Sequence, residues 1–262
     1  MNLGLQHKRV LITGGSKGIG LACAQVFAQA GAQIAIASRD SSNLDAAKQQ
    51  LAQSDIDVHT FVADLCQPQQ AQDLIQQFEH TLGPLDILLN AAGAAKRYPP
   101  LDLTPEAWTE AMQAKYFTYI YTMDAALVSM RKRKQGNIVN IIGAGGKHPS
   151  PMHLPGGAAN AALMLATAGL ATTWASHGIR INAINPGATS TDRIQGSINA
   201  EAKMTGQSTE QVFHALHQRI PMGRLAKPEE IANVALFLAS DLASYVTGAQ
   251  ITMTGGADPS VI

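Results

Sequence analysis

A glycine-rich turn close to the N-terminus constrains the fold of this chain more than any other feature. Residues 13–20 read Thr-Gly-Gly-Ser-Lys-Gly-Ile-Gly, directly after the strand-like run Val10-Leu11-Ile12 and at the start of a helical pattern. Glycines in this context let backbone N–H groups and a positive helix terminus approach a pyrophosphate closely. The pattern predicts nucleotide binding, whereas the same turn standing alone would indicate only tight packing of a strand on a helix. The residues expected to contact the nucleotide are Gly14, Ser16, Lys17, Gly18, Ile19 and Gly20.

Short apolar runs alternate with helical patterns along almost the whole chain. The expected strands are Val10–Thr13, Gln33–Ala37, Val58–Val62, Leu85–Leu89, Asn137–Ile142, Arg180–Ile184 and Gln250–Met253. Helices are expected to begin at Pro68, Pro105 and Pro228, because proline is tolerated in a first helical turn. Right-handed crossovers then predict one α/β domain over residues 1–262. It is a doubly wound parallel sheet of the Rossmann type, with about seven strands, helices on both faces and a ligand at the carboxyl ends of the strands.

The composition excludes several classes of protein. The chain has 19 Lys and Arg against 19 Asp and Glu, so it has no basic surplus with which to bind a nucleic acid or an anionic membrane. Cys23 and Cys66 are too few for a metal cluster or a disulfide framework, and no export signal is visible, so we expect a cytoplasmic protein without a metal. Residues 149–176 contain no charged side chain, but their Ala, Gly and Thr content favours a helix packed in protein over a membrane span.

The end of the second expected strand indicates which nicotinamide cofactor binds. A protein that selects NAD(H) usually places a carboxylate there for the ribose 2′-hydroxyl, whereas this chain has Ser38-Arg39, and also Lys17 in the glycine turn. Two cations that face a 2′-phosphate favour NADP(H) over NAD(H). The alternative is that both are ordinary solvated charges, with Asp40 placed to neutralise one of them.

Further motifs extend this pattern and carry a resemblance to a known family. They are Asp64-Leu65, Asn90-Ala91-Ala92-Gly93, Asn185-Pro186-Gly187 followed by Thr189 and Thr191, Gly223-Arg224, Pro228-Glu229-Glu230, Phe237-Leu238-Ala239-Ser240 and Thr247-Gly248. Over essentially its whole length the chain resembles the short-chain dehydrogenases/reductases. The resemblance implies that Asp64 and Leu65 border the adenine and that the segment of about 189–222 closes over a small-molecule substrate. It also implies contacts to the cofactor from Asn90, Ala91, Gly93, Pro186, Gly187, Thr189 and Thr191.

The chain departs from the family at the reacting groups. Active members have an Asn, a Ser, and a Tyr and a Lys four residues apart, which together manage the proton at a carbonyl oxygen. Alignment without gaps puts Lys115, Gly143, Gly156 and Asn160 at these positions. Because a positioned acid or base contributes roughly a factor of 10² to 10⁴ in rate, an ordinary dehydrogenase mechanism is not expected. Hydride transfer to an electrophilic acceptor, such as an iminium or a conjugated carbonyl, is still compatible with these residues.

Three side chains are candidates for a replacement chemistry. The family has an Asn on the first of two helices and a Lys on the second, whereas this chain has Lys115 and Asn160 at these positions. The pocket would then keep one ammonium and one amide with their helices exchanged, unless Lys115 is a solvated surface lysine. His153 is a candidate proton donor near neutral pH, unless it is an ordinary loop histidine. Arg193 is placed to pair with a carboxylate or with the phosphate of an acyl carrier, unless it forms a salt bridge with Asp192 or another local acid.

The sequence leaves three functions open. The first is an NADP(H)-dependent oxidoreductase with a rearranged catalytic site that acts on a carbonyl, an imine or an alcohol. The second is a catalytically silent NADP(H)-binding protein that acts as a sensor or as the partner of an active relative. The third is a non-redox lyase that uses Lys115 as a covalent amine. The resemblance also implies a homodimer or homotetramer, built on the helices of residues 105–131 and 156–175.

Overall fold

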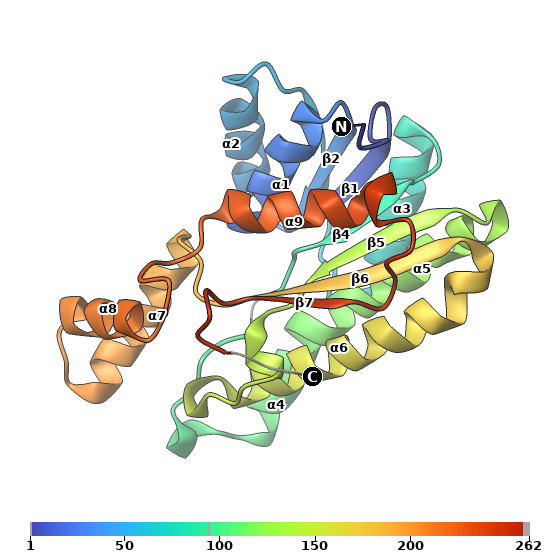
Figure 1. Ribbon diagram of the computed structural model, residues 1–262. Coiled ribbons are helices and arrows are strands. Elements are labelled where there is room, and N and C mark those ends of the chain that lie inside the picture. The colour runs from blue at the N-terminus through green and yellow to red at the C-terminus, as the bar shows by residue number, and fades with distance from the viewer. Residues whose placement is uncertain (1, 94, 259–262) are drawn as a thin grey trace.

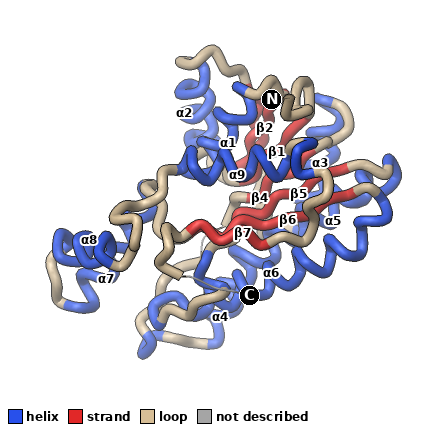
Figure 2. The backbone as a smooth tube through the Cα atoms, viewed as in Figure 1, coloured by secondary structure: helices blue, strands red, loops and turns tan. Residues whose placement is uncertain are grey.

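A parallel sheet of seven strands, in the order β3-β2-β1-β4-β5-β6-β7, forms the centre of the molecule. It is seen in a computed structural model that describes residues 2–93 and 95–258. Helices cover both faces of this sheet (Figures 1 and 2). The expected α/β fold of the doubly wound, Rossmann type is therefore confirmed.

The strands and helices lie close to where the sequence predicts them. The strands are β1 (Arg9–Thr13), β2 (Gln33–Ser38), β3 (Val58–Val62), β4 (Ile87–Asn90), β5 (Gly136–Ile141), β6 (Ile179–Pro186) and β7 (Gln250–Met253). The helices are α1 (Gly18–Gln29), α2 (Ser41–Ala52), α3 (Pro68–Leu82), α4 (Pro105–Ala111), α5 (Thr118–Arg133), α6 (Leu154–Trp174), α7 (Asp192–Thr205), α8 (Thr209–Gln218) and α9 (Pro228–Ala239). The helices expected to begin at Pro68, Pro105 and Pro228 begin at those residues.

The segment expected as one long helix from Pro105 differs in one respect. A π-helical stretch, Met112–Phe117, separates α4 from α5. Such a stretch widens the helix locally and is frequent at functional sites. Here it contains Lys115, whose side chain is buried.

Alternate residues of the strands contribute to two cores, one on each face of the sheet. On β1, Val10 and Ile12 belong to the core beneath α1, α2 and α9, whereas Leu11 belongs to the core beneath α3, α5 and α6. Phe27 fills the first core and Phe78 the second, and both are fully buried. Burial of one such side chain contributes roughly 1.5–3 kcal/mol, so each helical layer is held to the sheet by its apolar face.

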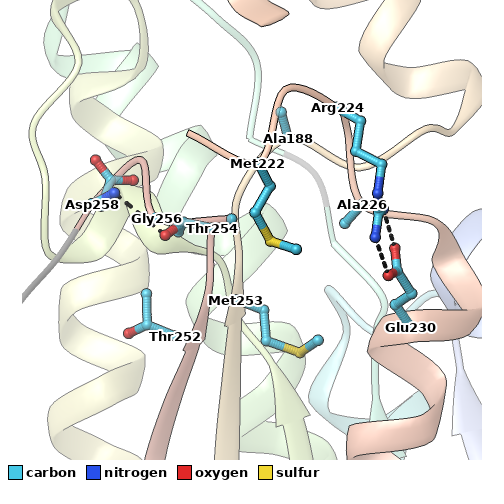
Figure 3. A pocket seen from close by; sticks show the side chains of 11 residues that line it. Ala188, Met222, Arg224, Ala226, Glu230, Thr252, Met253, Thr254, Gly256 and Asp258 are labelled. Atoms are coloured by element: carbon cyan, nitrogen blue, oxygen red, sulfur yellow. Dashed lines mark hydrogen bonds and ion pairs between the residues drawn. The ribbon is translucent and has the colours of Figure 1, made fainter. Parts of the chain in front are cut away.

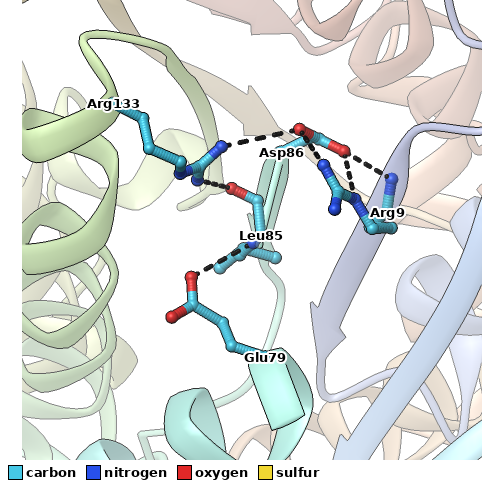
Figure 4. A network of polar contacts seen from close by, with 5 residues as sticks. All are labelled: Arg9, Glu79, Leu85, Asp86 and Arg133. Atoms are coloured by element: carbon cyan, nitrogen blue, oxygen red, sulfur yellow. Dashed lines mark hydrogen bonds and ion pairs between the residues drawn. The ribbon is translucent and has the colours of Figure 1, made fainter. Parts of the chain in front are cut away.

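An ion-pair network fixes the amino-terminal end of β4 (Figure 4). The carboxylate of Asp86 accepts hydrogen bonds from Arg9 Nε at 2.8 Å and Arg9 Nη2 at 3.0 Å, and Arg133 Nη1 lies 3.7 Å from it. Burial raises the pKa of Asp86, but the hydrogen bonds and charge of Arg9 outweigh burial and hold this pKa below its ordinary value. The network joins β1, β4 and the end of α5.

The segment of about 189–222 forms α7 and α8, which stand apart from the two main helical layers (Figure 1). The two helices share a small apolar cluster made by Ile198, Ala202 and Val212. A capping box formed by Ser208 and Gln211 starts α8. The segment that was expected to close over a substrate is therefore an ordered helical pair.

Helix α6 lies in the helical run Pro151–His177, which is long and apolar enough to cross a membrane by length and composition alone. Within the fold, α6 packs against β6 and against the loop that follows β5. Leu163 and Thr167 are among its buried residues. This packing is that of a helix inside a folded domain, which its small side chains favour.

Candidate functional site

The glycine turn opens α1, and its glycines permit very close backbone contacts. Gly14 has a φ of 67°, and a Cβ on it would lie 2.7 Å from the Cα of Ala92. A Cβ on Gly20 would lie 2.2 Å from the carbonyl oxygen of Gly14. Lys17 is the N-cap of α1 and, within the described part of the chain, makes no side-chain hydrogen bond to the first turn. The first N–H groups of α1 are therefore open to an anionic group.

A cavity of about 370 Å³ lies beside this turn, between α2 and the start of α9. Thr191 bounds it from the loop after β6, because its Cγ2 lies 3.2 Å from the position of a Cβ on Gly18. Ile19 packs instead against the core beneath α1. Residues that line the cavity include Ser16, Lys17, Gly18, Asn43, Thr191 and Asp192.

Arg39 directly follows Ser38, the last residue of β2, and the carboxylate of Asp40 is engaged elsewhere. It accepts hydrogen bonds from Ser42 Oγ at 2.6 Å and from the backbone N–H of Asn43 at 3.0 Å, which caps α2 and lowers the pKa of Asp40. Among residues 2–93 and 95–258, no carboxylate lies within 4.0 Å of the side-chain nitrogens of Lys17 or Arg39. Both cations remain available to an anion at the end of β2.

Asp64 and Leu65 follow β3 at the same edge of the sheet. Asp64 Oδ1 accepts a hydrogen bond from the backbone N–H of Cys66 at 3.1 Å, and the Asp64 N–H donates to Gln70 at 2.7 Å. Leu65 is buried in the core. The pKa of Cys66 is raised, chiefly by burial and by Asp64, and the charge of Arg39 opposes this rise. Arg39 therefore lies near this turn.

A buried polar network holds Asn90 at the end of β4. Asn90 Oδ1 accepts hydrogen bonds from Thr13 Oγ1 at 3.2 Å and Thr122 Oγ1 at 2.9 Å. Asn90 Nδ2 donates to Asn140 Oδ1 at 3.0 Å, and Asn140 Nδ2 donates to Thr167 Oγ1 at 3.0 Å. The network joins three strands to α5 and α6, and so fixes the strand ends that face a ligand. Asn90 was expected from the sequence and Thr13 begins the glycine turn, whereas no motif marks the roles of Thr122, Asn140 and Thr167.

The residues after Asn90 lie against the π-helical stretch. The backbone N–H of Ala91 donates to Thr13 at 3.1 Å. A Cβ on Gly93 would lie 2.5 Å from the carbonyl oxygen of Ala114 and 3.3 Å from the Cα of Lys115. Glycine is therefore required where this loop crosses the π-helix.

The residues expected to face the nicotinamide lie at the carboxyl end of β6. The N–H of Gly187 donates to the carbonyl oxygen of Met253 at 2.9 Å, and Thr189 Oγ1 donates to Gly187 at 3.2 Å. The carbonyl oxygen of Pro186 lies 4.0 Å from the position of a Cβ on Gly143. The end of β6 and the loop after β5 are thus neighbours.

Lys115 is 7% exposed and points into the molecule. Its Nζ donates to Tyr119 Oη at 2.8 Å and to the carbonyl oxygen of Ile141 at 3.1 Å. Burial, and then the charge of Arg193, holds the pKa of Lys115 well below its ordinary value. A solvated surface lysine is therefore the wrong interpretation of this residue.

Tyr119 is a partner of Lys115 that sequence analysis missed, although the four-residue spacing on one helix face could have indicated it. Its hydroxyl donates to the carbonyl oxygen of Ile141 at 2.5 Å. The side chain is fully buried, and burial raises its pKa. The hydroxyl is therefore engaged inside the protein and is not presented to a ligand.

His153 covers Gly156. A Cβ on Gly156 would lie 2.1 Å from His153 Cε1, 2.4 Å from Nε2 and 2.8 Å from the Cβ of Ala95. His153 Nδ1 is buried without a hydrogen-bond partner among the described residues. Burial, followed by the charges of Arg97, Arg193 and Lys115, lowers the pKa of His153 to about 4. This value does not fit the expectation of a proton donor near neutral pH, because the ring is already neutral there.

Asn160 lies beside Gly143 and close to His153. Gly143 has a φ of 129°, and a Cβ on it would lie 3.1 Å from Asn160 Nδ2. A Cβ on Gly145 would lie 3.5 Å from His153 Cδ2 and 3.7 Å from Asn160 Nδ2. The two polar side chains therefore converge on one point above the loop after β5.

Arg193 lies at the start of α7 and reaches back toward β4. Its Nη1 donates to the carbonyl oxygen of Gly93 at 3.4 Å. Within the described residues it forms no ion pair with Asp192 within 4.0 Å. The structure thus brings Arg193, Lys115 and His153 together at one end of the sheet.

A second cavity, of about 480 Å³, lies at the carboxyl ends of β6 and β7 (Figure 3). Met222 and Met253 supply apolar surface to it. Arg224 and Glu230, also on its wall, form two hydrogen bonds of 2.7 Å with each other, which holds the pKa of Glu230 at about 2. These charges satisfy one another, and sequence analysis did not predict this cavity.

Comparison with known proteins gives consistent matches over this architecture. A family model described as Enoyl-(Acyl carrier protein) reductase matches residues 14–258. The chain is 30% identical over 252 residues to gluconate 5-dehydrogenase from Gluconobacter oxydans, with 96% of this chain and 95% of the relative covered. It is 34% identical over 261 residues to a probable 2,4-dienoyl-CoA reductase from Bacillus subtilis, with 96% and 97% covered.

A solved structure with the same arrangement contains a cofactor. L-Sorbose reductase from Gluconobacter frateurii, in complex with NADPH and L-sorbose, matches with a TM-score of 0.91 at 28% identity, and 100% of each chain is covered. The residues matched by the family model take in the glycine turn, the Asn90 network and the loops after β5 and β6. Because the family model matches most of the chain, and relatives of 30% identity or more match almost its whole length, the chain belongs to the short-chain dehydrogenase/reductase family.

Proposed function

We propose that the protein is an NADP(H)-dependent oxidoreductase that reduces an electrophilic carbon of a small molecule with a rearranged set of reacting groups. The observation that supports this proposal most is that the glycine turn and His153 lie at the same edge of the sheet. The glycine turn lies open at the carboxyl end of β1, and the imidazole of His153 covers Gly156 beside the loop that follows β5. Ligands of doubly wound sheets bind at this edge.

NADP(H) is favoured over NAD(H) by Lys17 and Arg39. Neither pairs with a carboxylate within 4.0 Å in the described part of the chain, so both fit a 2′-phosphate. The L-sorbose reductase that this chain resembles was solved with NADPH. When bound, the cofactor supplies a hydride, with two electrons, to the substrate carbon. A carbonyl oxygen or a neutral imine nitrogen then takes up one proton, a conjugated carbonyl takes it up at the α-carbon, and an iminium nitrogen takes up none.

His153 is assigned the role of holding the substrate's oxygen or nitrogen. The ring is neutral at pH 7, since its pKa is about 4, and a neutral imidazole donates one hydrogen bond. Its unpartnered Nδ1 is consistent with a hydrogen bond that a ligand completes. Neutral imidazoles polarise carbonyls in other enzymes, and the proton then comes from water.

Asn160 is assigned a second donor role beside His153. Its Nδ2 lies next to Gly143, the residue aligned with the family's serine, and both side chains converge above Gly145. Lys115 contacts the carbonyl oxygen of Ile141, two residues before Gly143, and so acts as a positioning residue for this loop. The contact of the Lys115 amine with Ile141 and that of the Asn160 amide with Gly143 support the proposed exchange of the two groups between the helices.

Turnover with purified protein tests the proposal. NADPH absorbance is followed with a panel of iminium ions, conjugated carbonyls, ketones and aldehydes. We expect His153→Ala and Asn160→Ala each to lower kcat/KM by about 10² to 10³ without changing the Kd of NADPH, as for loss of one preorganised donor. His80→Ala, at an exposed histidine of α3 outside the site, is the matched control. Full activity of His153→Ala would remove His153 from the mechanism.

Each of the two other functions is supported by one observation. A silent NADP(H)-binding protein is favoured by the glycines at positions 143 and 156, and tight NADPH binding without turnover of any panel member would support it. A lyase is favoured by the lowered pKa of Lys115, since a covalent amine must be neutral. Borohydride trapping of substrate on Lys115 would support that function.

We also propose an oligomeric state and a cellular location for the protein. Exposed apolar residues lie on α4, α5 and α6, among them Trp108, Val128 and Leu165, and Leu165 is 78% exposed. A dimer or tetramer that covers this face would bury them. Balanced charge supports a cytoplasmic protein that binds neither nucleic acid nor membrane. Light scattering of the purified protein measures the assembly.

A further inference from the structure

Two basic side chains meet beside the loop that follows β4. Arg193 Nη1 donates to the carbonyl oxygen of Gly93 at 3.4 Å. Gly93 in turn lies on the backbone of Lys115, since a Cβ on it would be 3.3 Å from the Lys115 Cα. The guanidinium of Arg193 is therefore held at the mouth of the site, in front of the buried lysine.

A third basic side chain comes from the loop after β4. The backbone N–H of Tyr98 donates to the carbonyl oxygen of Met152 at 3.1 Å, which joins this loop to the segment that carries His153. The same loop also contacts the start of α6, because the Cβ of Ala95 lies 2.8 Å from the position of a Cβ on Gly156. Arg97, between these two anchor points, is exposed, and its charge lowers the pKa of His153.

Little negative charge balances these groups. Within 4.0 Å, no carboxylate pairs with Arg97, Arg193 or Lys115 in the described ranges 2–93 and 95–258. Although the Arg97 side chain reaches solvent, partial burial of its guanidinium lowers its pKa, and the charge of Glu201 opposes this. Glu201 also lies 3.8 Å from Arg219, so its charge is shared. The guanidinium groups of Arg97 and Arg193 repel each other at a half-buried site unless an anion is present, so this end of the site is suited to a negatively charged ligand.

We propose that the substrate carries a carboxylate beside the carbon that is reduced, and that Arg97 and Arg193 bind this carboxylate. The inference rests on the proposed function, because it needs a reducing centre next to His153. A planar guanidinium matches a carboxylate through paired hydrogen bonds, and both arginines are exposed enough to reach one. A 2-oxo carboxylic acid has this chemistry. An α,β-unsaturated carboxylic acid has a related one, in which the hydride enters one carbon further from the carboxylate and the α-carbon takes up the proton. A thioester of coenzyme A lacks this chemistry, because its negative charge lies on phosphates of the carrier, far from the carbon that is reduced.

Matched acids and amides test this inference. A set of 2-oxo and α,β-unsaturated carboxylic acids is compared with the corresponding primary amides, first by calorimetric binding to the protein–NADP⁺ complex and then by NADPH oxidation. We expect each productive acid to bind about tenfold or more tightly than its amide, as for a charge-assisted hydrogen bond. Arg97→Gln and Arg193→Gln should each reduce this ratio at least threefold, and Arg97→Lys and Arg193→Lys should retain part of it. Lys132→Gln, on the exposed end of α5, is the control for loss of one positive charge.

The two readouts separate the inference from the function on which it rests. Selective binding of acids without NADPH oxidation would support the anion site and contradict the reductase function. NADPH oxidation with amides as fast as with acids would support the reductase function and overturn the anion site. Failure of every acid to bind would also overturn the anion site. If Arg193→Gln weakens NADPH binding and leaves the ratio of acid to amide unchanged, the guanidinium serves the cofactor and the inference is wrong.

Discussion

The imidazole ring of His153 lies over the α-carbon of Gly156, so closely that a Cβ on the glycine would be 2.1 Å from Cε1. Gly169, further along the same helix, has no neighbour within 4 Å of its Cβ position. These two of the three glycines of α6 therefore have different roles. Gly156 makes room for a side chain, whereas Gly169 leaves open space.

Alanine at these two glycines should have opposite effects on stability. Gly156→Ala should lower the free energy of unfolding by about 1–3 kcal/mol, because its methyl group overlaps His153 and Ala95. Gly169→Ala should raise it by up to about 1 kcal/mol, because alanine is the better helix former. Urea unfolding measures both. In the double variant with His153→Ala, the cost of Gly156→Ala should fall, and an unchanged cost would contradict the contact.

The lowered pKa of His153 predicts a loss of stability in mild acid. Its pKa is about 4 in the folded protein against an ordinary value of 6.5, so between these values the unfolded chain binds a proton that the folded chain does not. Stability should therefore fall as pH decreases from about 6.5 toward about 4. Between pH 7.5 and pH 5 we expect the wild type to lose about 1–2 kcal/mol more than His153→Gln. Urea unfolding at both pH values measures this loss, and an equal loss in the two proteins would contradict the lowered pKa of His153.

Lys115 predicts a change on the alkaline side. Its pKa is held well below 10.5, chiefly by burial, so the unfolded chain binds a proton that the folded chain lacks. The contribution of this residue to stability should improve as pH rises toward 10.5. Lys115→Met should remove that pH dependence while keeping most of the buried volume. The measurement is the change in urea midpoint between pH 7 and pH 9.5, and equal changes in the two proteins would refute the prediction.

Asp86 should matter far more to stability than an exposed acid of the same charge. Asp86→Asn weakens the pairing with Arg9 and Arg133 at a buried position, and should cost about 2–4 kcal/mol at pH 7. The pKa of Asp86 is lower in the folded protein than its ordinary value of 3.8. Its contribution to stability is therefore present above pH 3.8 and is lost as the pH falls through the pKa of the folded protein. The two proteins should converge in strong acid. Asp57→Asn, which breaks an exposed pair of 3.9 Å with Lys48, should cost about 0.5 kcal/mol or less.

The cations near the end of β2 predict the choice of cofactor. Arg39→Ser should weaken NADPH binding about 10-fold to 100-fold and leave NADH binding nearly unchanged, because only NADPH carries the 2′-phosphate. Fluorescence titration with both cofactors gives the two Kd values. Lys132→Gln serves again as the charge control. An equal loss for both cofactors would place Arg39 on a part of the ligand that they share.

The strands and the glycine turn were predictable because they depend on local pattern. Buried parallel strands appear as short apolar runs, and a strand–glycine–helix order has few other meanings. The proline-led helix starts at Pro68, Pro105 and Pro228 follow from one covalent property of proline. In these cases the local signal and the tertiary structure favour the same conformation.

The contacts of the site were less predictable because they depend on the path of the backbone. Tyr119 meets Lys115 within the region of the π-helical stretch, which the apolar pattern does not reveal. The position of His153 over Gly156 follows from a loop whose course is fixed by close glycine contacts with α6. His153 was expected from the sequence, but its pKa depends first on burial and then on charges from three other segments.

The backbone at Gly143 has an evolutionary consequence. With a φ of 129° and the amide of Asn160 only 3.1 Å from its Cβ position, Gly143→Ser would require the loop to be rebuilt. Gly156→Tyr would likewise need His153 to leave. Neither substitution should therefore be accepted without movement of its neighbours, so these two glycines restrict the single mutations that this sequence can explore.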